Sequence, residues 1–198
     1  MADLENTVLN KLSDYIHTFS NVLDADDYFR LLHLVKNYDF GEISSPNGSV
    51  YQLTGERYNK KLSPNDGEIF DLIHKAFIKT LPKIYDSYCP FIPTDLRYNK
   101  YSGYWLCKYT EGSYLSYHTD SDADAASVTA SFTINSDYEG GDMIFWDDYV
   151  LEKERNCIHV YPSSLTYPHR VDKVTKGIRY SVVVWFAYQK GDDWRKQW

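Results

Sequence analysis

Short segments that suit β-strands, separated by turn residues, follow one another from Tyr98 to Tyr188. They are Gly103–Thr110, Ser127–Asn135, Asp142–Trp146, Asn156–Tyr161, His169–Val174 and Ile178–Tyr188. Strands this short and this frequent are typical of a sandwich, a barrel or a jelly roll. We therefore expect residues 98–190 to form a β-core.

Residues 1–97 carry helix signals instead. Asp24 is a suitable N-cap for a helix over Ala25–Val35. The apolar residues at helical spacing are Phe29, Leu32 and Val35, with Leu31 and Leu34 beside them. This pattern predicts a helix that lays one apolar stripe on the β-core.

A second helix start stands at Ser63-Pro64-Asn65-Asp66, where a cap residue precedes proline and an acid. Behind it, Ile69, Ile73 and Phe77 lie on one helical stripe. Pro82 is predicted to end or kink this helix, because proline lacks the backbone N–H that an inner helical position needs.

Residues 37–62, between the two helices, are rich in Gly, Ser, Asn and Tyr, with a strand-like stretch at residues 50–53. A mobile lid over a site and an ordinary surface loop explain this composition equally well. The chain has no internal repeat or linker. We therefore expect residues 1–198 to form a single domain that is mainly β, with the helices packed on the outside.

Composition indicates which classes of binding partner are disfavoured. A net charge of −7 disfavours binding to a phosphate backbone, which attracts proteins of the opposite charge. Three cysteines at no metal-ligand spacing indicate reduced thiols rather than a disulfide framework. The sequence shows no signal peptide and no apolar run long enough to span a bilayer, so we expect a cytoplasmic protein without a membrane partner.

A candidate metal site stands out in the β-region. His118 and Asp120 are two residues apart, so in an extended chain both side chains point to the same face. His169 stands at the start of another predicted strand. Two histidines and one carboxylate on one side of an octahedral ion form the facial triad of non-haem Fe(II) oxygenases, which leaves three coordination positions open.

The segment after His169 strengthens this interpretation. Thr175-Lys176-Gly177 suits a three-residue hairpin loop, which would pair Val171 with Ser181 and put Arg179, Ser181 and Trp185 on the same face as His169. Along such a strand, His169 and Arg179 would be roughly 13 Å apart. That gap suits a short dicarboxylate that chelates the metal at one end and pairs with the arginine fork at the other.

The segment Ser127–Asn135 alternates in the same way. Thr129, Ser131 and Thr133 carry small hydroxyls between apolar neighbours. This alternation suits the wall of a polar pocket, and it suits a solvent-facing strand equally well.

With these residues in view, the chain resembles the prolyl 4-hydroxylase branch of the iron(II)/2-oxoglutarate oxygenases. The likeness runs from about Tyr109 to Phe186. Its motifs are Tyr109-x-x-Gly112-x-Tyr114 before His118-x-Asp120, then Tyr138-Glu139-Gly140-Gly141-Asp142, then Tyr161-Pro162-Ser163 followed by His169-x-Val171 and Gly177-x-Arg179-Tyr180-Ser181. The order and spacing of these motifs make the resemblance specific.

The resemblance implies a double-stranded β-helix (jelly roll) and a hydroxylase that converts 2-oxoglutarate and O2 to succinate and CO2. His118, Asp120 and His169 would bind Fe(II), and ascorbate is the candidate reductant. The remaining site residues would contact the co-substrate or line its pocket: Arg179 and Ser181 at the distal carboxylate, with Thr133 beside them, Tyr109 near the metal, and Trp185 on the pocket wall. Relatives often carry a tyrosine at the position of Thr133.

Some neighbouring activities are disfavoured within this family. Halogenating relatives replace the carboxylate ligand by a small residue, whereas this chain has Asp120. Relatives that dealkylate nucleic acids carry a second arginine six residues after the first, and here that position is Trp185. A non-catalytic binding module on the same fold would not be expected to keep the triad and Arg179 together.

The resemblance favours a prolyl residue in a peptide or protein as the substrate, with another side chain or a free amino acid as the alternative. Five tyrosines could line a groove for a proline-rich strand, or they could simply fill the core: Tyr98, Tyr101, Tyr104, Tyr114 and Tyr117. Asp120, Asp122 and Asp124 form an acidic cluster that could attract a cationic substrate or belong to a solvated loop.

Overall fold

The computed structural model describes residues 11–41, 57–88, 98–101, 103–121 and 126–188. Its helical elements are η1 (Leu12–Tyr15), α1 (Ala25–Lys36), η2 (Pro64–Asp66) and α2 (Glu68–Tyr88). Its strands are β1 (His17–Ser20), β2 (Arg57–Lys61), β3 (Tyr98–Tyr101), β4 (Trp105–Tyr109), β5 (Leu115–His118), β6 (Ala126–Thr133), β7 (Glu139–Gly140), β8 (Met143–Phe145), β9 (Tyr149–Val150), β10 (Cys157–Pro162), β11 (His169–Val171), β12 (Val174–Lys176) and β13 (Arg179–Tyr188).

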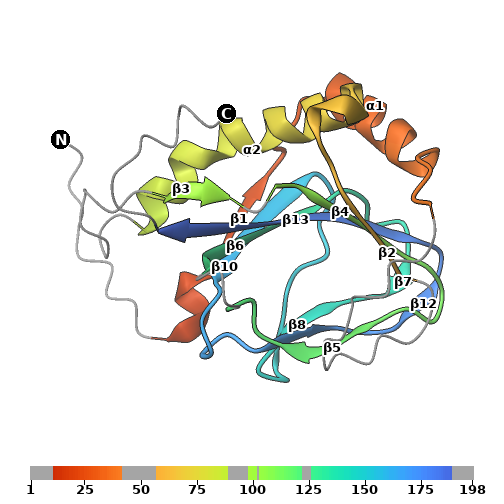
Figure 1. Ribbon diagram of the computed structural model, residues 1–198. Helices are drawn as coiled ribbons and strands as arrows, with labels where there is room; N and C mark the ends of the chain where they lie inside the picture. The colour runs from red at the N-terminus through yellow and green to blue at the C-terminus, as the bar shows by residue number, and fades with distance from the viewer. Residues whose placement is uncertain (1–10, 42–56, 89–97, 102, 122–125, 189–198) are drawn as a thin grey trace.

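Two β-sheets lie face to face, and α1 and α2 cover the outer face of the larger sheet (Figure 1). The larger sheet has the strand order β1-β10-β6-β13-β4-β2, and β3 also pairs with β13. The smaller sheet has the order β5-β11-β8-β9, and β12 pairs separately with β7. This arrangement confirms the expected fold class, a mainly β jelly roll with flanking helices.

The two edges of the larger sheet come from the first third of the chain. At one edge, β1 pairs antiparallel with β10, and at the other edge β2 pairs antiparallel with β4. The N-terminal region therefore contributes strands to the β-core as well as helices, in addition to what the sequence predicted.

Helix α1 begins as predicted but turns a different stripe inward. The side chain of Asp24 accepts a hydrogen bond of 3.0 Å from the backbone N–H of Asp27. Tyr28, Leu31 and Val35 are buried, whereas the side chain of Phe29 is 57% exposed. The prediction that Phe29 faces the core is wrong, because Tyr28 gives the stripe 28-31-35 an equally good helical spacing.

Helix α2 has the predicted apolar stripe, with Ile69, Ile73 and Phe77 buried. The start signal at Ser63 forms the short 3₁₀ turn η2 instead, and α2 begins after it at Glu68. The helix also continues through Pro82 to Tyr88, so of the two predicted alternatives, an end or a kink at Pro82, the structure excludes the end. Burial of residues on both sides of the proline, such as Leu81 and Ile84, holds this end of the helix on the sheet.

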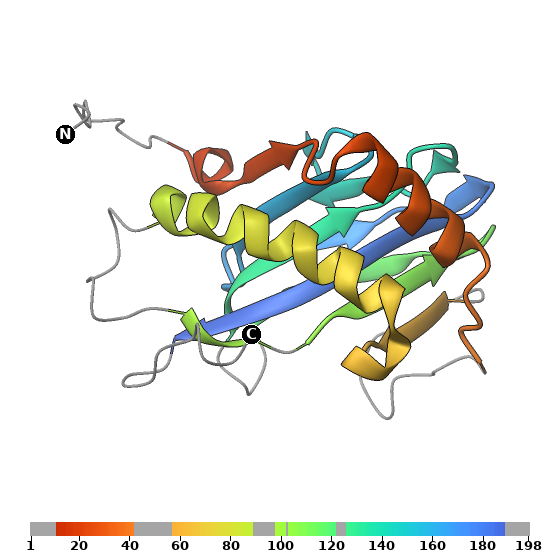
Figure 2. The same ribbon diagram turned by 90° about the horizontal axis from the view of Figure 1, so that it is seen from above.

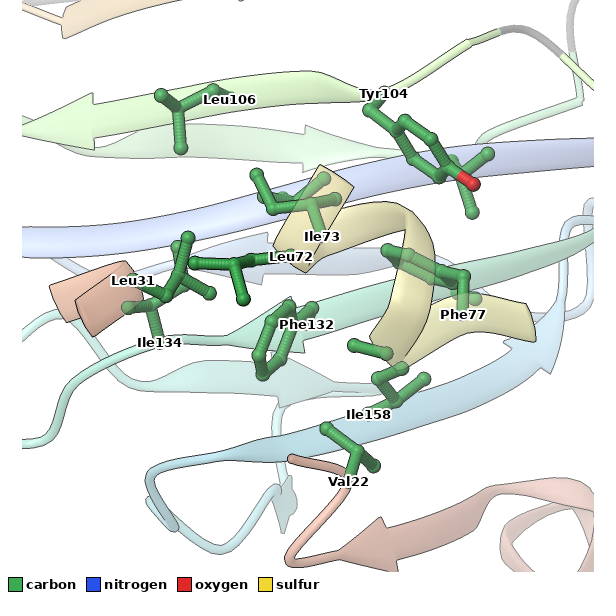
Figure 3. Packing of buried hydrophobic residues seen from close by; sticks show 14 of the residues in the cluster. Val22, Leu31, Leu72, Ile73, Phe77, Tyr104, Leu106, Phe132, Ile134 and Ile158 are labelled. Carbon is green, nitrogen blue, oxygen red and sulfur yellow. The ribbon is translucent and has the colours of Figure 1, made fainter. Parts of the chain in front are cut away.

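The main hydrophobic core lies between the helices and the larger sheet, where α1 and α2 run across its strands (Figure 2). Leu72, Ile73 and Phe77 of α2 meet Leu106, Phe132 and Ile158 from three different strands (Figure 3). Because side chains alternate along a strand, the residues between these apolar ones face the smaller sheet. None of the described helices is both long enough and apolar enough to cross a membrane.

Candidate metal centre

His118, Asp120 and His169 meet between the two sheets. His118 ends β5 and lies directly opposite His169, which begins β11. The three side chains each offer one ligand atom, and these atoms all lie within 4.8 Å of one another. Nε2 of His118 is 3.6 Å from Oδ1 of Asp120, and Nε2 of His169 is 3.6 Å from Oδ2. These gaps are slightly wider than the roughly 3 Å between adjacent ligands of an octahedral ion with bonds of about 2.1 Å.

Both imidazoles have their Nε2 lone pair directed at the centre. Nδ1 of His118 donates a hydrogen bond of 2.9 Å to the carbonyl of Ser116, and Nδ1 of His169 donates one of 3.1 Å to the carbonyl of Tyr167. A carbonyl can only accept, so the proton of each neutral ring is on Nδ1 and Nε2 is left as a base. Two such nitrogens beside a carboxylate can bind a divalent cation.

The carboxylate of Asp120 is fixed by two hydroxyl groups on the larger sheet. Thr129 Oγ1 donates to Oδ2 at 2.8 Å and the hydroxyl of Tyr161 donates to the same oxygen at 3.1 Å. Burial by itself would raise the pKa of Asp120, but its contacts with His118, His169 and Thr129 outweigh burial and lower it well below the usual range. The group is therefore an anion at neutral pH, as a metal ligand should be.

His169 is buried, and burial lowers its pKa to about 4, although the nearby Asp120 acts in the opposite direction. The ring is therefore neutral at physiological pH, and no proton has to leave Nε2 before a metal binds. Tyr161 is also buried, and burial together with Asp120 raises its pKa well above the usual value. Its hydroxyl thus remains a donor to Asp120.

Arg179, at the other end of the space between the sheets, is a buried cation. Its side chain is 4% exposed, Nη1 donates a hydrogen bond of 2.9 Å to Ser181 Oγ, and the guanidinium carbon lies 5.0 Å from the ring centre of Tyr109. Burial alone would lower the pKa of Arg179, but Tyr138, Tyr109 and Cys107 beside it raise it, so the group stays charged.

This cation lacks an anion in the part of the chain that the structure describes. No Asp or Glu there forms an ion pair with Arg179, and its buried Nε has no hydrogen-bond partner among those residues. A buried charge without a partner is costly, so the site is built for an anionic ligand. A dicarboxylate that reaches a metal at the other end fits this requirement.

The hairpin predicted from the sequence does not form. β11 pairs with β5 and β8 in the smaller sheet, whereas β13 pairs with β4 and β6 in the larger one. The strand between them, β12, pairs with β7. His169 and Arg179 therefore lie on opposite sheets, and the estimated separation along one hairpin does not apply.

Glycines explain why residues 174–176 pair elsewhere. Gly140 has φ +67°, and a Cβ built on it would lie 2.2 Å from the carbonyl oxygen of Lys173. Only glycine permits so close an approach. Gly141 follows at φ +64°, with Tyr138 and Arg179 packed against the place that a side chain would occupy. The Gly-Gly turn thus makes room for β12 and for the arginine.

The alternation predicted for β13 and β6 holds in the structure. Ser181 pairs with Thr133, and Trp185 pairs with Thr129, so these side chains share the inner face of the larger sheet. Tyr109 lies opposite Arg179 on β4. The structure therefore brings the residues predicted for the co-substrate onto one face, with Trp185 at the end beside the metal centre.

One inner-face residue, His159, was given no role from the sequence. It is 1% exposed, and its Nδ1 shares a hydrogen bond of 2.9 Å with Oγ1 of Thr18 on β1. It lines a small cavity together with Thr133 and Tyr138, the latter being a neighbour of Arg179. The sequence signal that could have placed His159 on the inner face is its alternation with Cys157 and Tyr161 along β10.

Tyr104 and Tyr117, two of the five tyrosines considered for a groove, lie away from the metal centre. Tyr104 is fully buried in the core beneath the helices, and Tyr117 contacts Arg170 on the outer face of the smaller sheet. The side chains of Tyr98 and Tyr101 lie outside the described residues, as do Asp122, Asp124 and residues 42–56 of the suggested lid. Cys107 and Cys157 are buried thiols that form no disulfide among the described residues, while Cys89 also falls outside the described part.

Comparison with known proteins agrees with this geometry. Residues 104–187 match the sequence profile of the 2OG-Fe(II) oxygenase superfamily. A PKHD-type hydroxylase from Gloeothece citriformis is 24% identical over 180 residues, which cover 86% of this chain and 77% of that protein.

Solved structures share the fold. A prolyl-4-hydroxylase from Pseudomonas putida has a TM-score of 0.68 at 19% identity, covering 88% of this chain and 93% of that one. A prolyl hydroxylase from Trichoplax adhaerens, in complex with a peptide from the oxygen degradation domain of hypoxia inducible factor, has a TM-score of 0.69 at 16% identity, covering 88% and 84%. Residues 104–187 are thus similar to the 2OG-Fe(II) oxygenase superfamily, and the chain has the fold of the prolyl hydroxylases.

Proposed function

We propose that His118, Asp120 and His169 bind the Fe(II) that this superfamily uses. The observation that carries the proposal is their convergence: two Nε2 atoms and one carboxylate lie within 4.8 Å, and each Nδ1 is held by a backbone carbonyl. These three residues would hold the ion, and with only three protein ligands it could also bind 2-oxoglutarate and O2.

Arg179 binds the distal carboxylate of 2-oxoglutarate in this proposal. The buried guanidinium has no carboxylate partner among the described residues, and its planar fork suits a carboxylate. Ser181 orients the fork through its hydrogen bond to Nη1. Thr133 lies beside Ser181 and Tyr109 lies under the guanidinium, so both would border the co-substrate.

The bound iron supplies the oxidation: 2-oxoglutarate and O2 become succinate and CO2, and one oxygen atom enters an unactivated C–H bond of the substrate. The chain's own residues hold the reactants. Thr129 and Tyr161 fix the carboxylate ligand, Arg179 fixes the co-substrate, and the apolar wall that includes Phe145 keeps water from the centre. Trp185 borders the space where the substrate enters.

The substrate that we propose is a prolyl residue in a peptide or protein. Support comes from the prolyl hydroxylases that share the fold, one of which was solved with a peptide. A different side chain or a free amino acid is the alternative. A chain kept only as a binding module would need no buried arginine without a carboxylate partner, so the site itself favours an enzyme.

The test has two stages. Anaerobic addition of Fe(II) and 2-oxoglutarate should produce a weak visible charge-transfer band, which His169→Ala abolishes and the exposed-site control His33→Ala retains. Proline-containing peptides are then screened for a mass gain of one oxygen atom matched by succinate. No band in the wild-type protein would refute the iron site, whereas succinate without peptide oxidation would refute only the prolyl substrate.

A further inference from the structure

The inner face of the larger sheet changes from buried to open along β13. Arg179 and Ser181 are 4% and 1% exposed, whereas Val183 and Trp185 are half-buried. On this face of β13 the accessible side chains are therefore those nearer Trp185. A substrate side chain can contact the face there.

Trp185 stands next to the metal centre. It is the direct cross-strand partner of Thr129, whose hydroxyl bonds Asp120. Cross-strand neighbours have Cβ atoms about 5 Å apart. A substrate residue placed against this indole is therefore beside the carboxylate ligand.

The open surface continues from Trp185 toward the sheet edge. Trp105, on β4, meets Trp185 edge to face with ring centres 6.4 Å apart. Lys61, on the edge strand β2, pairs with Trp105, and its Nζ lies 5.8 Å from the centre of that indole. Trp105 is half-buried and Lys61 is exposed, so both are accessible.

Lys61 carries a positive charge at the end of the surface that runs from Trp185 through Trp105 to the sheet edge. Among the residues that the structure describes, no carboxylate lies within 4.0 Å of its Nζ, whereas Lys36, Lys75, Lys153 and Lys176 all form such ion pairs. Indole faces hold apolar rings and aliphatic groups, and a free ammonium attracts a carboxylate.

We propose that Lys61, Trp105 and Trp185 form a subsite that selects an extended peptide with an acidic residue near the target. From β6 to β2 there are three strand spacings of about 4.8 Å, or about 14 Å, and an extended peptide rises about 3.3 Å per residue. The acidic residue therefore lies three to five positions from the hydroxylated one. The inference rests on the proposed function, because it takes the metal centre as the place of reaction.

The experiment uses the full chain loaded with Mn(II) and 2-oxoglutarate, so that binding is measured without turnover. Labelled peptides carry one proline, with a single Glu moved from one to six positions away on either side. Fluorescence anisotropy should show about two- to fivefold tighter binding when Glu is three to five residues away on one side, on the scale of an exposed ion pair. Lys61→Ala should remove this gain.

Lys60→Ala is the matched control, because Lys60 is exposed on the same strand but points to the opposite face of the sheet. It should keep the positional gain. Trp105→Leu should weaken binding of every peptide in the series, while the difference between Glu positions persists.

Equal binding of all peptides, a gain that survives Lys61→Ala, or no peptide binding at all would overturn the subsite. Failure of the proposed function looks different: wild-type protein with Fe(II) would form no succinate from 2-oxoglutarate. The two results are obtained from separate assays and do not depend on each other.

Discussion

Thr129 donates a hydrogen bond of 2.8 Å from Oγ1 to Oδ2 of Asp120, and this bond ties the larger sheet to the proposed iron ligand. Thr129 has no exposed surface, and its hydroxyl also lies 2.9 Å from that of Ser163. The orientation of the carboxylate thus depends on a residue that does not touch the metal.

Thr129→Val removes this hydroxyl with little change of shape. We expect the affinity for Fe(II) or Mn(II) to fall about 10- to 100-fold, the usual effect of losing a group that orients a metal ligand. Isothermal titration calorimetry with the metal ion measures this affinity. Thr80→Val, which removes a buried hydroxyl on α2 bonded to the carbonyl of Ala76, should leave metal affinity unchanged. Equal affinities for the two variants would contradict the role of Thr129.

Arg179→Lys keeps a positive charge but loses the planar fork. We expect KM for 2-oxoglutarate to rise by roughly tenfold or more, because an ammonium cannot pair both carboxylate oxygens as a guanidinium does. Metal affinity without 2-oxoglutarate should not change. Arg170→Lys, in the exposed network with Asp147 and Asp172, is the control that should leave KM unchanged. Succinate formation at varied 2-oxoglutarate measures both.

His159 makes the stability of the metal-free protein depend on pH. Burial, with a smaller contribution from the charge of Arg179, lowers the pKa of His159 from 6.5 to about 4. Between these values the unfolded chain binds a proton that the folded protein does not, so the free energy of unfolding decreases as the pH falls from about 6.5 to about 4. The contribution is on the order of 3 kcal/mol.

His159→Gln should make this decrease shallower, while His33→Gln, at an exposed position, should not. Denaturant unfolding of metal-free protein at pH 4.5 and pH 7.5 gives the two free energies for each variant. An unchanged pH dependence in His159→Gln would show that the ring is not buried in its neutral form.

The inward stripe of α1 can be tested by a pair of substitutions. Leu31 is 0% exposed and Phe29 is 57% exposed. Leu31→Ala should lower the free energy of unfolding by about 2–5 kcal/mol, whereas Phe29→Ala should change it by less than about 0.5 kcal/mol. Thermal or denaturant unfolding followed by circular dichroism measures both. A larger loss in Phe29→Ala would mean that this ring has a partner beyond the described residues.

The sequence predicted most of the inner face of the larger sheet. The period of two along β6 and β13 determines which residues share a face, and for that reason Thr133, Ser181 and Arg179 could be grouped before the structure was known. The same periodicity was used to pair His118 with Asp120, but Asp120 lies in a bend just after β5 ends at His118. These are local rules, and they hold whatever the partner strands are.

The pairing of strands could not be predicted in the same way. Residues 174–176 have a good local hairpin turn, but the structure pairs them with β7, more than thirty residues earlier. The pairing of β12 with β7 depends on the close backbone approach at Gly140, which no local sequence pattern reveals. Likewise, His159 acquires its role through Thr18, which is 141 residues away in the chain.

The edge strands of the larger sheet determine how far the chain can be shortened. The segment that matches the superfamily profile, residues 104–187, contains neither β1 nor β2. Expressed alone, it would present the free edges of β10 and β4, with unpaired N–H and C=O groups that invite association with other chains. It would also lose Lys61 and the Thr18 contact to His159. We therefore expect the matched segment to aggregate when it is expressed alone. A shortened protein that stays in solution should retain β1 and β2, the two edge strands of the larger sheet.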